Sequence, residues 1–188
     1  MTSNYLDIDS GWSLFLDRDG VINKRIIGDY IKSWEEFEFL PGVLEAIQRF
    51  TELFGKLFIV TNQQGIGKGI MLETDLEHIH ENMMHAIRQH GGNINKIYHS
   101  PYKAEEKSVF RKPNIGLARK AKIDFPVVEF DKSIMAGDSI SDMHFGKNAG
   151  MITVFINSDK EQISEHKEFI DYNFPDLISF ANSLKSNL

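Results

Sequence analysis

A chain of 188 residues with 41% hydrophobic and 26% charged residues is typical of a globular protein with room for a sizeable core. The net charge of −6 argues against a nucleic-acid partner, because no overall basic field attracts a polyanion. The absence of cysteine excludes disulfides and thiolate zinc sites. No apolar run is long enough to cross a membrane, and residues 1–12 lack the pattern of a secretion signal, so we expect a cytoplasmic protein without a membrane partner.

Apolar runs alternate with amphipathic stretches along the chain. In chain order the pattern predicts a strand at 12–17, a helix at 41–55, a strand at 56–62, a helix at 72–92, a strand at 94–100, a helix at 113–121, a strand at 132–138, a helix at 141–150, strands at 151–156 and 169–173, and a helix at 175–184. Such alternation indicates a doubly wound α/β fold, in which helices cover both faces of a parallel sheet. No repeat or linker interrupts it, so residues 1–188 are predicted to form a single domain.

Two acids directly follow the first predicted strand. In SLFLDRDGVIN, residues 13–23, Asp17 and Asp19 lie two positions apart. Neighbouring carboxylates repel each other unless a metal ion, a proton or an arginine lies between them. Because ligands of a doubly wound sheet bind beyond the carboxyl ends of its strands, both acids are candidates for a functional site.

Further reactive side chains follow other predicted strands. Thr61 lies near the end of the second strand, Asp138 and Asp142 lie at or after the end of the fourth, and Lys112 lies in the loop before the third helix. Each feature also has a plainer interpretation, since Asp-x-Asp-Gly favours surface turns, GDSISD could cap a helix, and a lysine beside an arginine could be solvated. Their joint occurrence at the ends of alternating strands favours an active site.

These four pieces resemble, in order and spacing, the motifs of the haloacid dehalogenase superfamily of aspartate-nucleophile phosphatases. The Asp-x-Asp-x-Thr/Val motif corresponds to DRDGV at 17–21, and the threonine or serine motif to Thr61. The lysine motif corresponds to Lys112, and the acidic motif GDxxxD to GDSISD at 137–142. The resemblance covers nearly the whole chain and implies a haloacid dehalogenase-like (HAD-like) fold. The segments after the first two motifs are too short for a cap domain.

The resemblance implies a role for each motif. Asp17 would attack phosphorus and become an aspartyl phosphate, while Asp19 would protonate the leaving oxygen and later take a proton from water. Thr61 and Lys112 would hold the phosphoryl oxygens as charge builds up in the transition state. Mg²⁺, which prefers oxygen ligands, is the expected cofactor. Its expected ligands are Asp17, Asp19 through its backbone carbonyl, Asp138, and Asp142, which supports the metal's water shell or instead orients Lys112.

Four local sequences narrow the resemblance further. They are FLDRDGVIN at 15–23, DYIKSWEEFEFLPGV at 29–43, VTNQQGIGKG at 60–69 and FRKPNIGL at 110–117, and they are similar to D-glycero-D-manno-heptose 1,7-bisphosphate phosphatases and histidinol-phosphate phosphatases. The implied partner is a small phosphorylated substrate: first a heptose bisphosphate that loses its 7-phosphate, alternatively histidinol phosphate or another sugar phosphate. The expected substrate-binding residues are Arg25, Asp29, Tyr30, Asn62, Gln63, Gln64, Lys68 and Arg111.

One departure from that subgroup concerns zinc. The subgroup carries a zinc loop of cysteines and a histidine before its Arg-Lys-Pro, whereas this chain has YHSPYKAEEKSVFRKP from Tyr98 onward. His99 alone cannot rebuild a four-ligand site, so no zinc is expected. We expect packing of Tyr98, Tyr102 and Phe110 to hold the loop instead. HENMMH at 80–85 is one residue too long for a zinc-protease motif, so the histidines of this helix are interpreted as ordinary helix residues.

Several other functions share parts of this pattern. A receiver domain has the same fold and Mg²⁺-binding acids, but its phosphoacceptor would end an internal strand, where this chain has Thr61. A non-catalytic phosphoryl-binding protein would have little reason to keep both Asp17 and Asp19. A phosphomutase uses the same residues, yet a site without a cap favours hydrolysis. A nucleic-acid end phosphatase also suits an open site, but the negative net charge argues against it. We expect a monomer.

Overall fold

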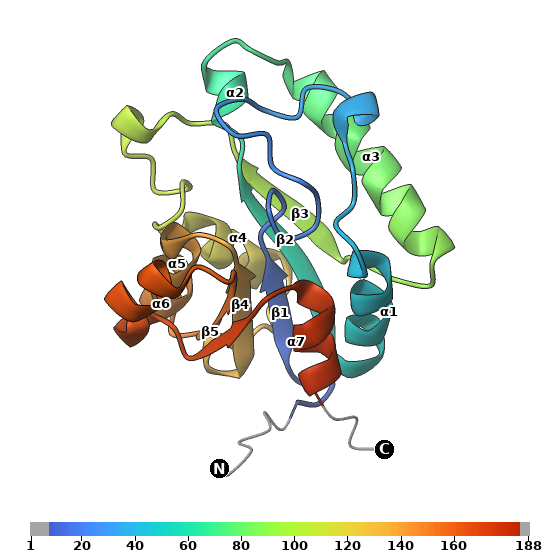
Figure 1. The fold of residues 1–188 in the computed structure, drawn as a ribbon. Coiled ribbons are helices and arrows are strands. Elements are labelled where there is room, and N and C mark those ends of the chain that lie inside the picture. Colours follow the sequence, from blue (N-terminus) through green and yellow to red (C-terminus); the bar gives the residue numbers. More distant parts are fainter. Residues whose placement is uncertain (1–7, 185–188) are drawn as a thin grey trace.

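The sheet is the central feature of the computed structural model, which describes residues 8–184. Within them six strands pair in the order β3-β2-β1-β4-β5-β6, and every adjacent pair is parallel (Figure 1). The strands are β1 (Ser13–Leu16), β2 (Lys56–Asn62), β3 (Lys96–Ser100), β4 (Ser133–Gly137), β5 (Ile152–Ile156) and β6 (Tyr172–Phe174). This confirms the predicted doubly wound sheet. The strand order changes direction between β1 and β4, because β2 and β3 lie on one side of this pair and β5 and β6 lie on the other.

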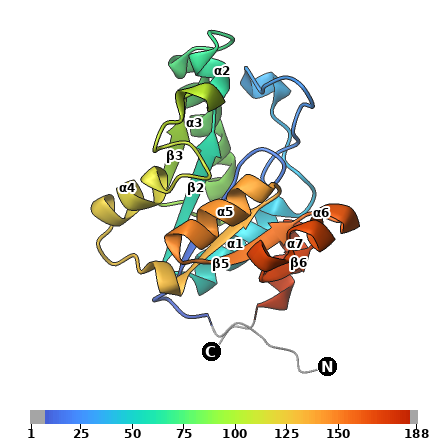
Figure 2. The ribbon, with the colours of Figure 1, turned by 90° about the vertical axis from the view of Figure 1, so that its left-hand side faces the viewer.

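Helices cover both faces of the sheet (Figures 1 and 2). One face carries α1 (Val43–Leu53), α3 (Glu73–Gln89) and α7 (Leu177–Ser183), and the other carries α4 (Gly116–Asp124) and α5 (Ile140–Ala149). The short helices α2 (Gln64–Gly67) and α6 (Lys160–Glu165) follow β2 and β5. Among the described residues, no helix combines the length and apolar character needed to cross a bilayer. Residues 1–7, part of the stretch predicted not to be a secretion signal, lie outside the described residues.

The core consists of two apolar layers, one on each side of the sheet. Leu14 and Leu16 of β1 point into the layer under α1, α3 and α7, and Phe15 points into the layer under α4 and α5. Because side chains alternate along a strand and both faces are covered, all four residues of β1 are buried. Residues 14–16 of this strand therefore form a continuous apolar run, and packing on both faces fixes the position of the residues that follow it.

The predicted elements agree with the structure to within three residues at each end. The first helix, predicted at 41–55, is two residues shorter at each end. Gly42 precedes α1 with a φ of 74°, a left-handed conformation that favours glycine, so the helix begins at Val43. At the other end Gly55 lies outside the helix and donates its N–H to the Trp12 carbonyl at 3.0 Å.

Three further differences concern short segments. The helix predicted at 113–121 begins only at Gly116, because the Asn114 N–H donates to the Arg111 carbonyl in a preceding turn. The last strand begins at Tyr172 rather than at residue 169, because Lys167–Phe169 form a 3-10 turn. Helices α2 and α6 were not predicted, since such short helices show no apolar periodicity.

Candidate active site

The residues predicted for the site gather beyond the carboxyl ends of β1, β2 and β4, around a cavity of about 500 Å³. Those that line the cavity are Asp17, Asp19, Arg25, Asp29, Tyr30, Thr61, Asn62, Gln63, Gln64, Lys68, Arg111, Lys112 and Asp142. Asp138 lies beside it, with a carboxylate oxygen within 4.8 Å of oxygens of Asp17 and Asp142. The cavity thus lies at the switch point of the sheet, where ligands of this fold bind.

A tight turn after β1 places the two acids of DRDG. The Arg18 carbonyl accepts the N–H groups of Ile22 at 2.8 Å and Asn23 at 3.1 Å. Gly20 has a φ of 95°, and a Cβ at this position would lie 2.0 Å from Asp138 Oδ2. The glycine is therefore required both for the turn and for the close approach of the acid after β4.

Lys112 is the cation at the centre of a buried group. Its Nζ lies 2.8 Å from Asp17 Oδ1 and 2.6 Å from Asp142 Oδ1, and it donates to the Val60 carbonyl at 2.8 Å. Asn62 fixes the main chain of Lys112: its Oδ1 accepts the N–H at 3.0 Å, and its Nδ2 donates to the carbonyl at 3.2 Å. Of the two roles considered for Asp142, orienting Lys112 is the one that these contacts support.

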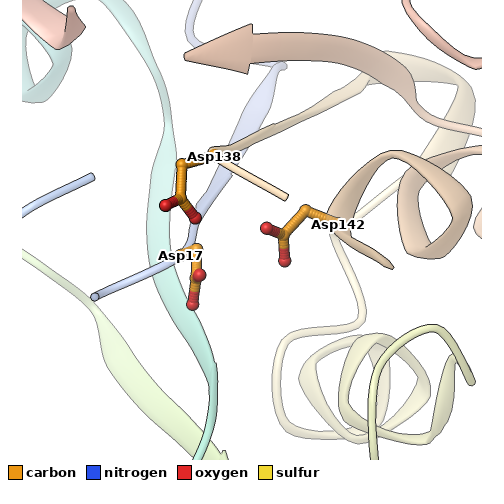
Figure 3. A group of neighbouring side chains, drawn as sticks. All are labelled: Asp17, Asp138 and Asp142. Carbon is orange, nitrogen blue, oxygen red and sulfur yellow. The ribbon is translucent and has the colours of Figure 1, made fainter. Parts of the chain in front are cut away.

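The carboxylates around Lys112 carry more negative charge than the neighbouring cations neutralise. Asp138 and Asp142 turn their carboxylates toward Asp17 (Figure 3). Burial, and then the charge of Asp142, raise the pKa of Asp17 to about 6 although Lys112 opposes the shift. Burial, and then the charge of Asp17, raise the pKa of Asp138 to about 7 although Arg25 opposes it. Such a cluster favours a bound cation.

The donor set fits Mg²⁺, because it offers carboxylate and carbonyl oxygens at one place. The position of the Arg25 guanidinium shows that these oxygens can interact with a cation. Its Nη2 donates to Asp138 Oδ1 at 2.9 Å and to the Asp19 carbonyl at 3.0 Å. Arg25 was predicted to bind substrate, whereas the structure places its guanidinium on two of the predicted metal ligands. Metal binding to both oxygens therefore requires Arg25 to move.

Asp19 is held by three donors. Its Oδ1 accepts from Arg18 Nη2 and Asn23 Nδ2, each at 2.9 Å, and its Oδ2 accepts from Gln63 Nε2 at 2.8 Å. Burial by itself raises the pKa of Asp19, but the charge of Arg18 and these hydrogen bonds lower the pKa below its ordinary value. Gln63 Nε2 also donates to Thr61 Oγ1 at 2.9 Å. The amide of Gln63, predicted to contact substrate, thus links Asp19 to Thr61.

We call Asp17, Asp19, Thr61, Lys112, Asp138 and Asp142 the floor of the cavity, and Asp29, Tyr30, Gln64, Lys68 and Arg111 its rim. On the rim, Lys68 Nζ donates to the Tyr30 hydroxyl at 3.0 Å, and Arg111 Nη1 donates to the Tyr102 carbonyl at 3.2 Å. Asp29 is paired with a neighbouring lysine of its own loop. The rim therefore presents two cations to the cavity.

The loop before Lys112 is not held as predicted. Tyr98 is buried, but Tyr102 and Phe110 are 41% and 40% exposed, so the packing of three aromatic rings was a wrong expectation. Hydrogen bonds close the loop instead, among them Asn114 Nδ2 to the Ser108 carbonyl at 2.9 Å. Aromatic residues in a loop can face water when polar contacts fix its backbone.

Comparisons with known proteins agree with this geometry. A family model described as polynucleotide kinase 3 phosphatase matches residues 14–184. A D-glycero-alpha-D-manno-heptose-1,7-bisphosphate 7-phosphatase of Campylobacter jejuni is 37% identical over 169 residues, which cover 89% of this chain and 94% of that protein. The chain belongs to the haloacid dehalogenase superfamily of phosphatases, in the heptose-1,7-bisphosphate phosphatase subgroup.

Two further members of this superfamily bear on the site. A D-glycero-beta-D-manno-heptose-1,7-bisphosphate 7-phosphatase of Helicobacter pylori is 36% identical over 143 residues, covering 76% of this chain and 80% of that protein. The crystal structure of a D,D-heptose 1,7-bisphosphate phosphatase from B. bronchiseptica, complexed with magnesium and phosphate, superimposes with a TM-score of 0.83 at 28% identity, covering 91% of this chain and 96% of that one. The likeness to a superfamily member with magnesium supports the predicted cofactor.

Three residues near Asp19 had no predicted role in the site. Arg18 and Asn23 donate to Asp19 directly. His80, interpreted as an ordinary helix residue, lies with its Nε2 3.2 Å from Arg18 Nη1. An arginine between two acids could have been suspected of pairing with one of them, but no local pattern connects His80 to a residue 62 positions away.

Proposed function

We propose that this protein is a Mg²⁺-dependent phosphatase that releases the 7-phosphate of D-glycero-D-manno-heptose 1,7-bisphosphate. The observation that carries the proposal is the buried set of Asp17, Lys112 and Asp142, which lines the same cavity as Asp19. The names of the relatives supply the substrate.

Asp17 is the nucleophile in this proposal. A carboxylate oxygen attacks phosphorus, the bond from phosphorus to the leaving oxygen breaks, and an aspartyl phosphate forms on Asp17. Mg²⁺, held by the carboxylates of Asp17 and Asp138 and the carbonyl of Asp19, would supply positive charge to the acids and to the phosphoryl oxygens. Lys112 adds a buried positive charge 2.8 Å from the nucleophile.

Asp19 transfers the protons. It donates to the leaving oxygen in the first step. In the second step it accepts a proton from water, whose oxygen attacks phosphorus, so that the bond between Asp17 and phosphorus breaks and inorganic phosphate leaves. Arg18 and the neighbouring donors keep Asp19 ionised in the free protein. The negative phosphate of the bound substrate raises that pKa, so binding prepares Asp19 to carry a proton.

Thr61 can donate a hydrogen bond from its hydroxyl to the phosphoryl group. Its Oγ1 accepts a hydrogen bond from Gln63 Nε2 at 2.9 Å, so its own O–H remains available as a donor. That O–H and Lys112 stabilise the equatorial oxygens as charge accumulates there.

The rim supports a substrate with a second anionic group. Lys68 and Arg111 line the same cavity as the floor, where they can meet the distal phosphate of a bisphosphate. A histidinol phosphate or a sugar monophosphate would leave these cations without a partner, which favours the bisphosphate.

We further propose that residues 1–188 act as one cytoplasmic, monomeric domain without nucleic-acid or membrane partners. The net charge of −6 and the pairing of all described strands in one sheet support this proposal.

The test is phosphate release, with and without Mg²⁺, from both heptose bisphosphate anomers, histidinol phosphate, sugar monophosphates, a nucleotide and a 3′-phosphorylated oligonucleotide. We expect Mg²⁺-dependent activity with kcat/KM highest for a heptose bisphosphate. Preference for the oligonucleotide would show that the substrate is a nucleic-acid end rather than a heptose bisphosphate. No phosphate release from any compound would contradict the phosphatase assignment.

A further inference from the structure

Arg18 is a buried arginine with a polar contact at each end of its guanidinium. The residue is 1% exposed. Its Nη2 donates to Asp19 Oδ1 at 2.9 Å, and its Nη1 lies 3.2 Å from Nε2 of His80, on α3. Helix α3 is thereby connected to the carboxyl end of β1 through a single guanidinium.

The chemistry of His80 suits an acceptor. Burial, and then the charge of Arg18, lower the pKa of His80 to about 3, so its ring is neutral at physiological pH. Arginine can only donate, so the contact requires an unprotonated Nε2 and places the ring proton on Nδ1. On its other side the ring lies 6.1 Å, between centroids, from that of His99, whose Nε2 is 2.6 Å from Glu73 Oε1.

His80 is one of two groups that fix the Arg18 guanidinium. Among the described residues the buried Nε of Arg18 has no hydrogen-bond partner, so Asp19 and His80 are its polar anchors. With His80 removed, Arg18 would keep only the acid that it orients, and Nη1 would be buried without an acceptor. The guanidinium would then rotate, and one of the three donors that aim Asp19 would be misplaced.

We propose that His80 is a positioning residue: it holds Arg18 so that Asp19 is aimed at the leaving oxygen of the substrate. This inference rests on the proposed function, in which Asp19 protonates that oxygen. It assigns to α3 a part in catalysis although His80 itself does not line the cavity.

The test separates proton transfer from general damage to the site. An alkyl phosphate, such as the heptose bisphosphate or a sugar phosphate, needs a proton on its leaving oxygen. The leaving group of 4-nitrophenyl phosphate departs as the 4-nitrophenolate anion and needs no proton. The readout is kcat/KM, which covers the steps up to departure of the leaving group and excludes hydrolysis of the aspartyl phosphate. The variants are His80→Leu, which removes the acceptor, and His80→Gln, which keeps one. His85→Gln, at an exposed histidine of the same helix, is the control.

We expect His80→Leu to lower kcat/KM for the alkyl phosphate by roughly tenfold to a hundredfold, a part of what general acid catalysis contributes, while 4-nitrophenyl phosphate changes less than about twofold. His80→Gln should recover most of the loss. Equal losses on both substrates, or no loss on either, would overturn the inference. An inactive wild-type enzyme would contradict the proposed function itself, and so the two failures are distinguishable.

A measurement on the resting protein covers the case in which His80→Leu does not fold. Long-range proton–nitrogen NMR should show the His80 ring as the neutral Nδ1–H tautomer, with the Nε2 signal displaced in an Arg18→Lys variant. A ring protonated on Nε2 would contradict the inference.

Discussion

The floor and the rim of the cavity differ in how the protein holds them. On the floor Asp17, Thr61, Lys112 and Asp142 are 0–6% exposed, and hydrogen bonds or ion pairs tie them to one another, to main chain or to the buried Gln63. On the rim Asp29 and Lys68 are exposed and the other residues are partly exposed, and all of them reach the cavity from loops or short helices.

This contrast indicates that the floor carries out the reaction and that the rim selects the substrate. Most floor residues lie at or just beyond the ends of central strands, and the ion pair between Lys112 and Asp142 fixes the remaining two, so phosphoryl transfer is preorganised. The rim residues lie on surface segments, so they can select a substrate without disturbing the reacting groups. Changes on the floor should therefore affect kcat, and changes on the rim should affect KM.

The largest effect is expected from Asp17→Asn, which removes the nucleophile. Turnover should fall by at least about a thousandfold. The thermal midpoint in the absence of Mg²⁺ should not fall, because the substitution relieves repulsion within a buried acid cluster. Phosphate release and thermal unfolding are the measurements, with the exposed Asp131→Asn as the matched control. Normal turnover in Asp17→Asn would break the distinction between floor and rim.

Arg25→Ala should strengthen metal binding. The guanidinium donates to Asp138 and to the Asp19 carbonyl, so it competes with a metal ion for both oxygens. Because Arg25 is about half exposed, we expect a modest gain, about tenfold at most, in the affinity for Mg²⁺ or Mn²⁺ measured by calorimetry without substrate. Lys24→Ala, at the exposed neighbour, is the control, and weaker binding in Arg25→Ala would show that Arg25 supports the metal.

Lys68→Met should raise KM for the bisphosphate about fivefold with little change in kcat, since a rim contact contributes to binding the distal phosphate rather than to the reaction. The same substitution should leave KM for a monophosphate unchanged. Steady-state kinetics on the two substrates is the measurement. A loss confined to kcat would place Lys68 functionally with the floor.

The smallest expected effect is the pH dependence of the metal's stabilisation. The raised pKa values of Asp17 and Asp138, about 6 and about 7, mean that the folded protein binds protons at these groups more tightly than the unfolded chain does. Their contribution to the free energy of unfolding is therefore full below the unfolded pKa, near 4, and is lost as pH rises through 6 to 7. Mg²⁺ binds the ionised forms and should offset that loss.

At a fixed Mg²⁺ concentration the rise in thermal midpoint should consequently be larger at pH 8 than at pH 5. Asp138→Asn should flatten this dependence. A shift that is equal at both pH values would contradict the raised pKa values.

The sequence predicted which residues meet at the cavity better than it predicted the contacts among them, for a physical reason. Floor residues follow strands at fixed offsets, so a motif such as GDSISD determines both their identity and their location. Contacts between distant segments have no such signal: His80 reaches Arg18 from another element, and Arg25 crosses the cavity to Asp138. The aromatic residues of the loop before Lys112 also led to a wrong expectation, since Tyr102 and Phe110 are about two-fifths exposed.

The central claim is that Asp17 carries the phosphoryl group. The most direct measurement is the mass of the peptide containing Asp17 after rapid acid quench of an Asp19→Asn variant mixed with 4-nitrophenyl phosphate and Mg²⁺. The first step with this substrate needs no proton from Asp19, and the variant lacks the base that activates water in the second step. We expect this peptide to gain the mass of one phosphoryl group, and the gain to be absent in Asp17→Asn. A phosphoryl group on another residue, or none while substrate is consumed, would contradict it.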